Sequence, residues 1–371
     1  NVLAFHGVNS NSSASSNTHL QDFLVQPVLM ATRATGTASE TFMAAPSPGS
    51  DNGLGVLGFV RDTQFSADRG FFDAPFQVAI TSNTAGAQIR YTTDGSLPSA
   101  TNGTLYTGSI TISTTTTLRA IAYNEGYAPT NVDTQTYIFL SDVIGQDASH
   151  VTQPYAPWGH DKDDADSASG YNLDDESDWE MDPDIVNGNQ QAVKDALVAI
   201  PTVSLVMDWN DLFSGSPMPG TFPAGSNAAP QPQGIYIHGS SNERYASLEY
   251  FNPNDLNDTF HLDVGAEIQG HSSTLRWNSD KLSFQVKFKL PYGPTELNYP
   301  VFANALFGEG STNEYDTLIL DAMYNYAWHH QNPIQRDYAR FVSDQVVADL
   351  QNLASGKGAP HGKFVHLYLN G

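Results

Sequence analysis

Basic side chains gather on one short stretch of a chain that is otherwise poor in them. From Lys281 to Lys289 apolar and polar residues alternate, so a strand would place Lys281, Lys287 and Lys289 on one face. The preceding segment, from Gly270 to Ser273, offers backbone N–H groups and hydroxyls that could donate to phosphate oxygens. Strand lysines are suited to pairing with α- and β-phosphates. The structural alternative is a turn followed by an edge strand whose lysines prevent it from pairing with other chains.

Carboxylates gather in a second stretch, from Asp161 to Asp184. Clustered carboxylates are the hard oxygen ligands that Ca²⁺ prefers. The EF-hand spacing fails, however, because the fifth position counted from Asp161 is Ala165 and the sixth is Asp166 rather than glycine. A solvated acidic loop is favoured, and calcium binding is the alternative.

Histidine-based sites have less support. His329 and His330 are adjacent, so on a helix they would point about 100° apart, and neither has a carboxylate four residues on. His361 and His366 flank an expected strand and are interpreted as structural. The sequence has no Gly-x-Ser-x-Gly motif to anchor a serine nucleophile. We therefore predict no histidine-dependent catalytic site or metal site.

Composition excludes several classes of function. The 371 residues carry 16 basic and 40 acidic side chains, a net charge of −24, which argues against nucleic acid as a partner. No apolar run approaches the roughly 20 residues that span a bilayer. The absence of cysteine excludes disulfides and thiolate sites. With the low lysine content, it favours a secreted or cell-surface bacterial protein. The opening residues contain neither a Met start nor a signal peptide, so we expect a fragment cut at both ends.

Charge and pattern divide the chain into four parts. Residues 1–50 hold two expected strands, interpreted as the end of an upstream β-sandwich that weakly resembles galactose-binding-like jelly rolls. Residues 53–140 alternate short strands and turns and predict an all-β sandwich. Residues 141–200 carry 14 acidic and two basic groups and are interpreted as an acidic linker that ends in a short helix between Ile185 and Ile200. Residues 201–371 mix strand and helix signals, including an amphipathic helix from Arg336 to Leu350 whose apolar stripe is expected in the core.

The second part resembles a known family. Ile89-Arg-Tyr-Thr-Thr-Asp-Gly-Ser-Leu-Pro, then Tyr106-Thr-Gly-Ser-Ile, then Thr117-Leu-Arg-Ala-Ile-Ala-Tyr-Asn-Glu-Gly-Tyr resembles the chitobiase/β-hexosaminidase C-terminal-type domain. The resemblance implies an immunoglobulin-like accessory module without catalysis of its own. Asp94-Gly95 supplies the positive φ of a tight hairpin, so Asp94 is expected to be structural.

The last part resembles the CotH kinase family, named for spore coat protein H. The resemblance rests on ordered segments across about 170 residues, among them Ile268-Gln-Gly-His-Ser-Ser, Lys281-Leu-Ser-Phe-Gln-Val-Lys-Phe-Lys and His361-Gly-Lys-Phe-Val-His-Leu-Tyr-Leu-Asn-Gly. It implies an incomplete α+β, atypical protein-kinase-like domain that uses ATP with Mg or Mn to phosphorylate protein hydroxyls. It carries nucleotide binding onto Gly270, Ser272, Ser273 and Lys281, with Ser283 in the matching Lys-x-Ser-Phe strand.

This chain departs from the family pattern in two places. Where many members carry Leu-Arg, this chain has Leu320-Asp321. Asp321 is interpreted as a capping residue or an ion-pair partner of Arg336 or Arg340, and metal binding is the less favoured alternative. The catalytic and metal-binding aspartates are expected beyond Gly371, so the fragment itself should be inactive and its metal residues stay unassigned. The alternative function is a non-catalytic surface scaffold or adhesin whose β-modules bind cell-surface polysaccharide.

Overall fold

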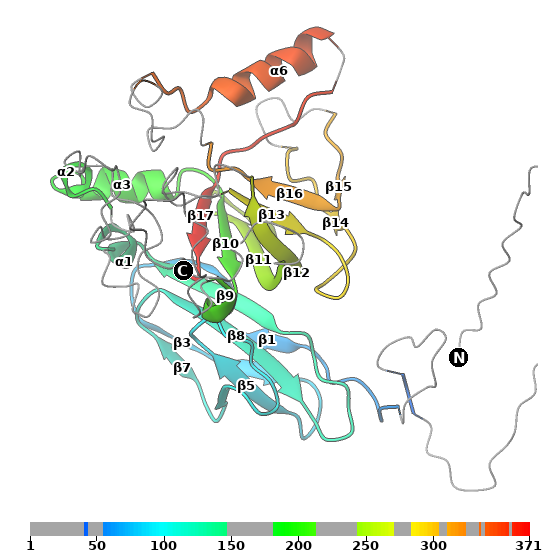
Figure 1. Ribbon diagram of the computed structural model, residues 1–371. Helices are drawn as coiled ribbons and strands as arrows, with labels where there is room; N and C mark the ends of the chain where they lie inside the picture. Colours follow the sequence, from blue (N-terminus) through cyan, green and yellow to red (C-terminus); the bar gives the residue numbers. More distant parts are fainter. Residues whose placement is uncertain are drawn as a thin grey trace, which may run out of the picture.

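The computed structural model describes residues 41–43, 55–146, 181–212, 243–270, 283–303, 310–323, 334, 338–355 and 358–371. These residues form two β-rich modules with few helices, one above the other in Figure 1. We call residues 55–146 the N-terminal module and the described part of 201–371 the C-terminal module. Apart from residues 41–43, the remnant expected at 1–50 lies outside the described residues, as does most of the acidic stretch.

The N-terminal module is a sandwich of short strands. Its main sheet has the order β2-β9-β8-β5-β6, and the pairs β1–β4 and β3–β7 complete it. The strands are β1 (Thr63–Phe65), β2 (Gly70–Phe72), β3 (Phe76–Val78), β4 (Ile80–Ser82), β5 (Gln88–Thr92), β6 (Thr104–Leu105), β7 (Ile110–Ile112), β8 (Thr116–Tyr123) and β9 (Asp133–Phe139). Leu118 and Tyr137 lie fully buried in its core. Gly95 has the predicted positive φ, 80°, and Asp94 accepts a hydrogen bond from the backbone N–H of Ser96. The predicted tight hairpin is not formed, because β5 ends at Thr92 and its partner β6 begins only at Thr104.

Short helices connect the modules along one side. These are α1 (Leu140–Ile144), α2 (Pro183–Val186) and α3 (Gln190–Leu197). The single short helix expected between Ile185 and Ile200 is thus two helices, and Gly188 separates them with a φ of 85°, which a helix cannot include. Asp182 caps α2 by accepting a hydrogen bond from the N–H of Asp184. These two acidic residues therefore have a local structural role.

A six-stranded sheet forms the centre of the C-terminal module. Its order is β16-β13-β12-β11-β10-β17, all antiparallel except β10–β17. The strands are β10 (Thr202–Val206), β11 (Arg244–Asn252), β12 (Asp255–Gln269), β13 (Ser283–Lys287), β16 (Thr317–Leu320) and β17 (His366–Leu369); β14 (Leu297–Asn298) and β15 (Glu314–Tyr315) pair beside it, and α4 (Trp209–Leu212) follows β10. Alternation places Leu248, Val264 and Phe284 on one buried apolar face. Polar residues occupy the opposite face.

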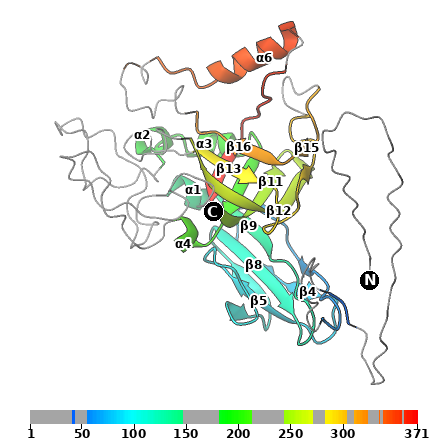
Figure 2. The same cartoon turned by 45° about the vertical axis from the view of Figure 1, so that its right-hand side comes forward.

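The N-terminal module covers part of that polar face (Figure 2). The outward-facing residues of β8 and β9 are buried rather than solvated: Arg119, Thr134, Thr136 and Ile138 are 0% exposed. The Thr136 and Ser204 hydroxyls lie 2.8 Å apart, and the Phe71 ring meets Phe251 edge-on at 5.7 Å. The two modules are therefore stacked sheet on sheet.

The helix expected from Arg336 forms later in the chain, as α6 (Ser343–Ser355). In Figure 1 it lies at the end of the molecule away from the N-terminal module. The prediction that its apolar stripe is core was wrong, because Val346, Val347 and Leu350 are 48%, 63% and 58% exposed. The period of 3.6 correctly identified a helix, but a period cannot determine which element, if any, covers its apolar side.

Candidate functional site

The polar face of the six-stranded sheet carries two groups of charged side chains. One group, which we call the module junction, consists of Arg69 and Arg119 of the N-terminal module with Tyr245, Glu249 and Asp263 of the C-terminal module. The other, which we call the lysine cluster, consists of Glu243, Glu267, Lys287 and Lys289. The lysine cluster keeps partial access to solvent, since the Lys289 side chain is 47% exposed. It is therefore the better candidate for binding a ligand.

Ion pairs hold the lysine cluster together across neighbouring strands. The Lys287 ammonium lies 2.6 Å from Oε1 of Glu267 and 3.1 Å from Oε2 of Glu243. Lys289 reaches Oε1 of the same Glu243 at 2.8 Å. The side chains of Glu243, Glu267 and Lys287 are only 3%, 9% and 18% exposed. Two positive and two negative charges thus form a compact, neutral group with both lysines held in place.

The surroundings keep these groups charged. Burial by itself would raise the pKa of Glu243, but hydrogen bonds from Lys289 and Lys287 outweigh it and lower that pKa. Burial would lower the pKa of Lys287, yet its hydrogen bonds with Glu267 and Glu243 raise it. Lys287 therefore stays an ammonium at neutral pH and can donate hydrogen bonds to an anionic group.

Two glycines allow the loop after β13 to fold onto the sheet beside the cluster. A Cβ on Gly265 would lie 2.7 Å from Glu243 Oε1 and 2.8 Å from the Tyr292 ring. A Cβ on Gly293 would lie 2.0 Å from the Asp263 carbonyl oxygen, which no side chain tolerates. Glu243 is consequently enclosed by Gly265, Tyr292 and the two lysines.

The residues predicted to bind nucleotide fall in and beside the β12–β13 connection. Gly270 directly follows β12 and has a φ of 112°, a conformation that favours glycine. Ser272, Ser273 and Lys281 lie outside the described residues. Gly270 adjoins Gln269, which pairs with Ser283, whereas Lys287 pairs with Gly265 further along the same strands. Among the described residues, Gly270 at the end of β12 thus lies on the same strand pair as Glu267 and Lys287.

Ser283 and Asp321 form a small structural link between β13 and β16. Ser283 donates a hydrogen bond to Asp321 at 3.2 Å and accepts one from the N–H of Ala322 at 2.9 Å. Asp321 also accepts from the N–H of Met323 at 2.8 Å, and Met323 has a φ of 58°. Asp321 therefore caps the chain at the end of β16, which agrees with the capping role among the predicted interpretations.

Sequence reasoning noticed the lysines of β13 and missed their partners. Glu267 could have been found, because Asp263, Gly265, Glu267 and Gln269 alternate on β12 just as the lysines do on β13. Glu243 carries no such signal. It stands before β11, and only the pairing of β11 with β12 brings it to Lys287.

The module junction contains the most deeply buried charges of the face. Arg69 donates from Nε to Glu249 at 2.8 Å and from Nη2 to the Thr134 carbonyl at 3.1 Å. Glu249 also accepts from the N–H of Thr136 at 3.1 Å and from its hydroxyl, and its side chain is 0% exposed. The N-terminal module supplies the arginines and the C-terminal module the carboxylates, so the stacking is charge-matched.

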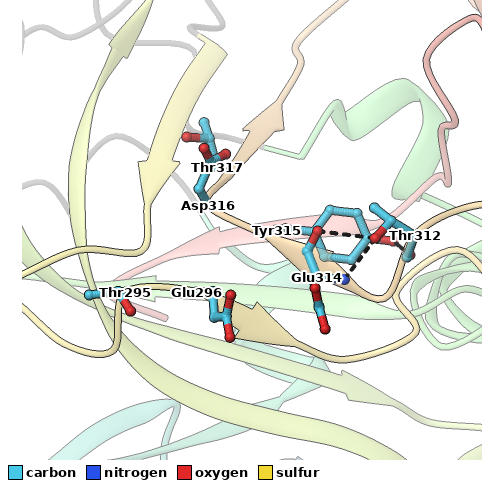
Figure 3. Close-up of a pocket in the computed structure, with 7 residues that line it drawn as sticks. All are labelled: Thr295, Glu296, Thr312, Glu314, Tyr315, Asp316 and Thr317. Atoms are coloured by element: carbon cyan, nitrogen blue, oxygen red, sulfur yellow. Dashed lines mark hydrogen bonds between the residues drawn. The ribbon is translucent and has the colours of Figure 1, made fainter. Parts of the chain in front are cut away.

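A shallow pocket of about 470 Å³ lies to the side of the sheet, beside β14 and β15. It is lined by Thr295, Glu296, Thr312, Glu314, Tyr315, Asp316 and Thr317 (Figure 3). Two of the lining residues, Thr312 and Tyr315, are engaged in local hydrogen bonds, such as that from the Glu314 N–H to the Thr312 hydroxyl at 3.1 Å. Within the described ranges, no group of three or more His, Asp or Glu side chains converges to hold a metal ion, and this pocket is no exception.

No helix in the part of the chain that the structure describes is long and apolar enough to cross a membrane.

Comparison with known proteins gives a match for one part of the chain. The family model of the chitobiase/beta-hexosaminidase C-terminal domain matches residues 67–134. Neither the curated proteins nor the solved structures contain a match to this chain. The match supports the resemblance found for the N-terminal module, and residues 67–134 are similar to the chitobiase/beta-hexosaminidase C-terminal domain.

Proposed function

We propose that the C-terminal module is a CotH-type, atypical kinase-like domain that binds ATP with Mg or Mn for phosphoryl transfer to a protein hydroxyl. We infer that the protein is secreted or attached to the surface of a bacterial cell. The observation that carries the proposal is the placement of Lys287 between Glu243 and Glu267, at 3.1 and 2.6 Å. A strand lysine held by a glutamate from another element is a recurring part of kinase sites.

The hairpin β12–β13 supports this assignment. In the sequence, Gly270 and the two serines suited to phosphate lie between its strands. Lys287 ends the second strand on the polar face, and Lys289 follows two residues later. The lysine cluster is neutral as it stands, so an incoming phosphate must share its lysines with the glutamates. We expect Mg²⁺ or Mn²⁺ to accompany the nucleotide, because the net charge of −24 otherwise opposes a polyanion.

The test is isothermal titration of ATP with Mg²⁺ or Mn²⁺ into the whole chain. Lys287→Met and Lys281→Ala should each weaken binding at least tenfold. Lys194→Met, on α3 and outside the lysine cluster, is the matched control and should leave the affinity unchanged. Absence of binding by the unsubstituted chain would refute the proposal. Equal affinity in Lys287→Met would exclude the lysine cluster as the nucleotide site.

A second function, polysaccharide binding by the N-terminal module, is favoured by exposed aromatic side chains of this module and by Phe42, which pairs with Val56 at its edge. Phe42 and Phe59 are 55% and 53% exposed, and their rings lie 6.2 Å apart. Tyr127 is 36% exposed and packs on Gly58, next to Phe59. Exposed rings offer flat amphipathic surfaces of the kind used at wet interfaces. Phe59→Ala should weaken binding to a cell-surface polysaccharide, measured by affinity electrophoresis; Leu105→Ala, also exposed, is the control.

A further inference from the structure

Arg119 of the N-terminal module extends into the C-terminal module. It belongs to β8 and is 0% exposed. Its Nη1 donates to the Gly95 carbonyl at 2.7 Å, and its guanidinium lies over the Tyr245 ring, 5.5 Å from the centroid. Tyr245 is on β11, so this side chain bridges the two modules. A fully buried guanidinium requires compensation by its neighbours.

That compensation comes from Asp263 and Tyr245. Burial lowers the pKa of Arg119, and attraction to Tyr245, Asp263 and Glu249 opposes this shift. Burial likewise raises the pKa of Asp263, and Tyr245 and Arg119 oppose it. Among the described residues, Nε and Nη2 of Arg119 and Oδ1 of Asp263 have no hydrogen-bond partner of good geometry. Opposite charges with unused donors and acceptors therefore face the same buried space.

Asp263 is in turn connected to the lysine cluster by close packing. Its carbonyl sets the position of Gly293, whose Cβ, if present, would lie 2.0 Å away. Tyr292, the preceding residue, packs over Gly265, and Gly265 also contacts Glu243. Glu243 pairs with both lysines. A shift of Asp263 would thus displace the loop that encloses Glu243, because close-packed groups transmit displacement.

We propose that Arg119 is a positioning residue for the lysine cluster and that the N-terminal module is an integral part of the site. Arg119 holds Tyr245 and Asp263, these hold the loop of Tyr292 and Gly293, and the loop holds Glu243 against Lys287 and Lys289. The inference rests on the proposed function only for the identity of the ligand, ATP.

The first test measures the lysines directly and needs no nucleotide. The whole chain is acetylated with a limiting amount of an N-hydroxysuccinimide ester, and the modification rate of each lysine is read by mass spectrometry. In Arg119→Met, Lys287 and Lys289 should react at least threefold faster than in the unsubstituted chain. Lys194 provides an internal reference, and Arg90→Met is the matched control, because Arg90 pairs within its own module with Tyr123 and Gly103.

Unchanged rates at Lys287 and Lys289 in a folded Arg119→Met chain would overturn the inference. If that variant fails to fold, Tyr245→Phe takes its place, because it keeps the ring under Arg119 and removes only the hydroxyl near Asp263. The same rule applies to it: faster lysine modification supports the inference, and unchanged rates overturn it.

A second readout links the positioning role to the ligand. If the unsubstituted chain binds ATP, Arg119→Met should weaken the affinity at least fivefold, Arg119→Lys should weaken it less, and Arg90→Met should not alter it. Failure of the unsubstituted chain to bind ATP would refute the proposed function and leave the acetylation result standing. Faster acetylation with unaltered ATP affinity would restrict Arg119 to holding the loop and overturn its role toward the ligand.

Discussion

The module junction and the lysine cluster occupy the same face of one sheet, and both pair carboxylates with basic groups. In the junction the basic groups come from the other module, and the carboxylate of Glu249 is 0% exposed. In the lysine cluster the partners come from the same module, and the Lys289 side chain stays 47% exposed. Buried charges are costly to separate, whereas exposed ones exchange partners readily. The junction is therefore suited to permanent docking and the cluster to reversible binding.

The largest expected effect follows from removing a charge at the junction. Glu249→Ala leaves Arg69 buried without its partner, and we expect a loss of about 3 to 5 kcal/mol in the free energy of unfolding. Urea denaturation followed by circular dichroism measures it. Glu125→Ala, at an exposed turn, is the control. A loss as small as that of the control would mean that the modules do not depend on this ion pair.

The pH dependence of stability tests the same covered region. Burial, with the nearby charges of Arg69 and Arg119, lowers the pKa of His261 from 6.5 to about 3. The unfolded chain therefore binds a proton that the folded chain does not, and between pH 7 and pH 5 this residue should remove about 2 kcal/mol of stability. In His261→Gln, the free energy of unfolding should not show this loss between pH 7 and pH 5. Urea denaturation of the variant and of the unsubstituted chain at both pH values measures it.

The effect of His261 has to be read from the difference between the variant and the unsubstituted chain, because Asp133 changes the free energy of unfolding with pH in the opposite direction. Burial raises the pKa of Asp133 to about 6, although the hydrogen bond from Thr63 partly offsets the rise. The folded chain then holds a proton that the unfolded chain releases, so this residue destabilises the fold as the pH rises from about 4 to above 6. A His261→Gln variant with the pH profile of the unsubstituted chain would show that His261 is solvated.

Two isoleucines, one buried between the modules and one exposed, allow the same comparison with a smaller expected change in stability. Ile138, 0% exposed, packs with Phe251 at the junction, whereas Ile319 lies on β16 and is 47% exposed. Ile138→Val should lower the free energy of unfolding by about 0.5 to 1.5 kcal/mol, and Ile319→Val should change it by less than about 0.5 kcal/mol. Thermal unfolding of both variants measures the difference. Equal effects would mean that the covered region is not closely packed.

The smallest effect is expected in the lysine cluster. Lys289→Ala removes one half-exposed partner of Glu243, which keeps Lys287 at 3.1 Å. The free energy of unfolding should fall by less than about 1 kcal/mol. Denaturation at low and at high salt checks this, since salt screens an exposed pair. A loss comparable to that of Glu249→Ala would show that the lysine cluster stabilises the fold as strongly as the module junction does. It would contradict the assignment of the cluster to reversible binding.

Much of the strand content could be predicted because the signals are local. Alternation over Lys281–Lys289 anticipated β13 and its buried Phe284 and Val286, and Asp94-Gly95 anticipated the positive φ of Gly95. The apolar stripe of α6 shows the limit of such signals. Its helix was expected, but its exposure was not, because burial depends on which other elements come near.

By itself, the sequence determined that the chain holds a β-sandwich of a recognisable type and a strand with lysines on one face. Both follow from local signals: the alternation of apolar and polar residues, and turn residues that lie next to the strands in the sequence. Only the tertiary structure decided that Glu243 and Glu267 reach Lys287, and that Arg119 is buried against Tyr245 of the other module. Those contacts join residues far apart in the chain. They arise from strand pairing and sheet stacking, which no local pattern encodes.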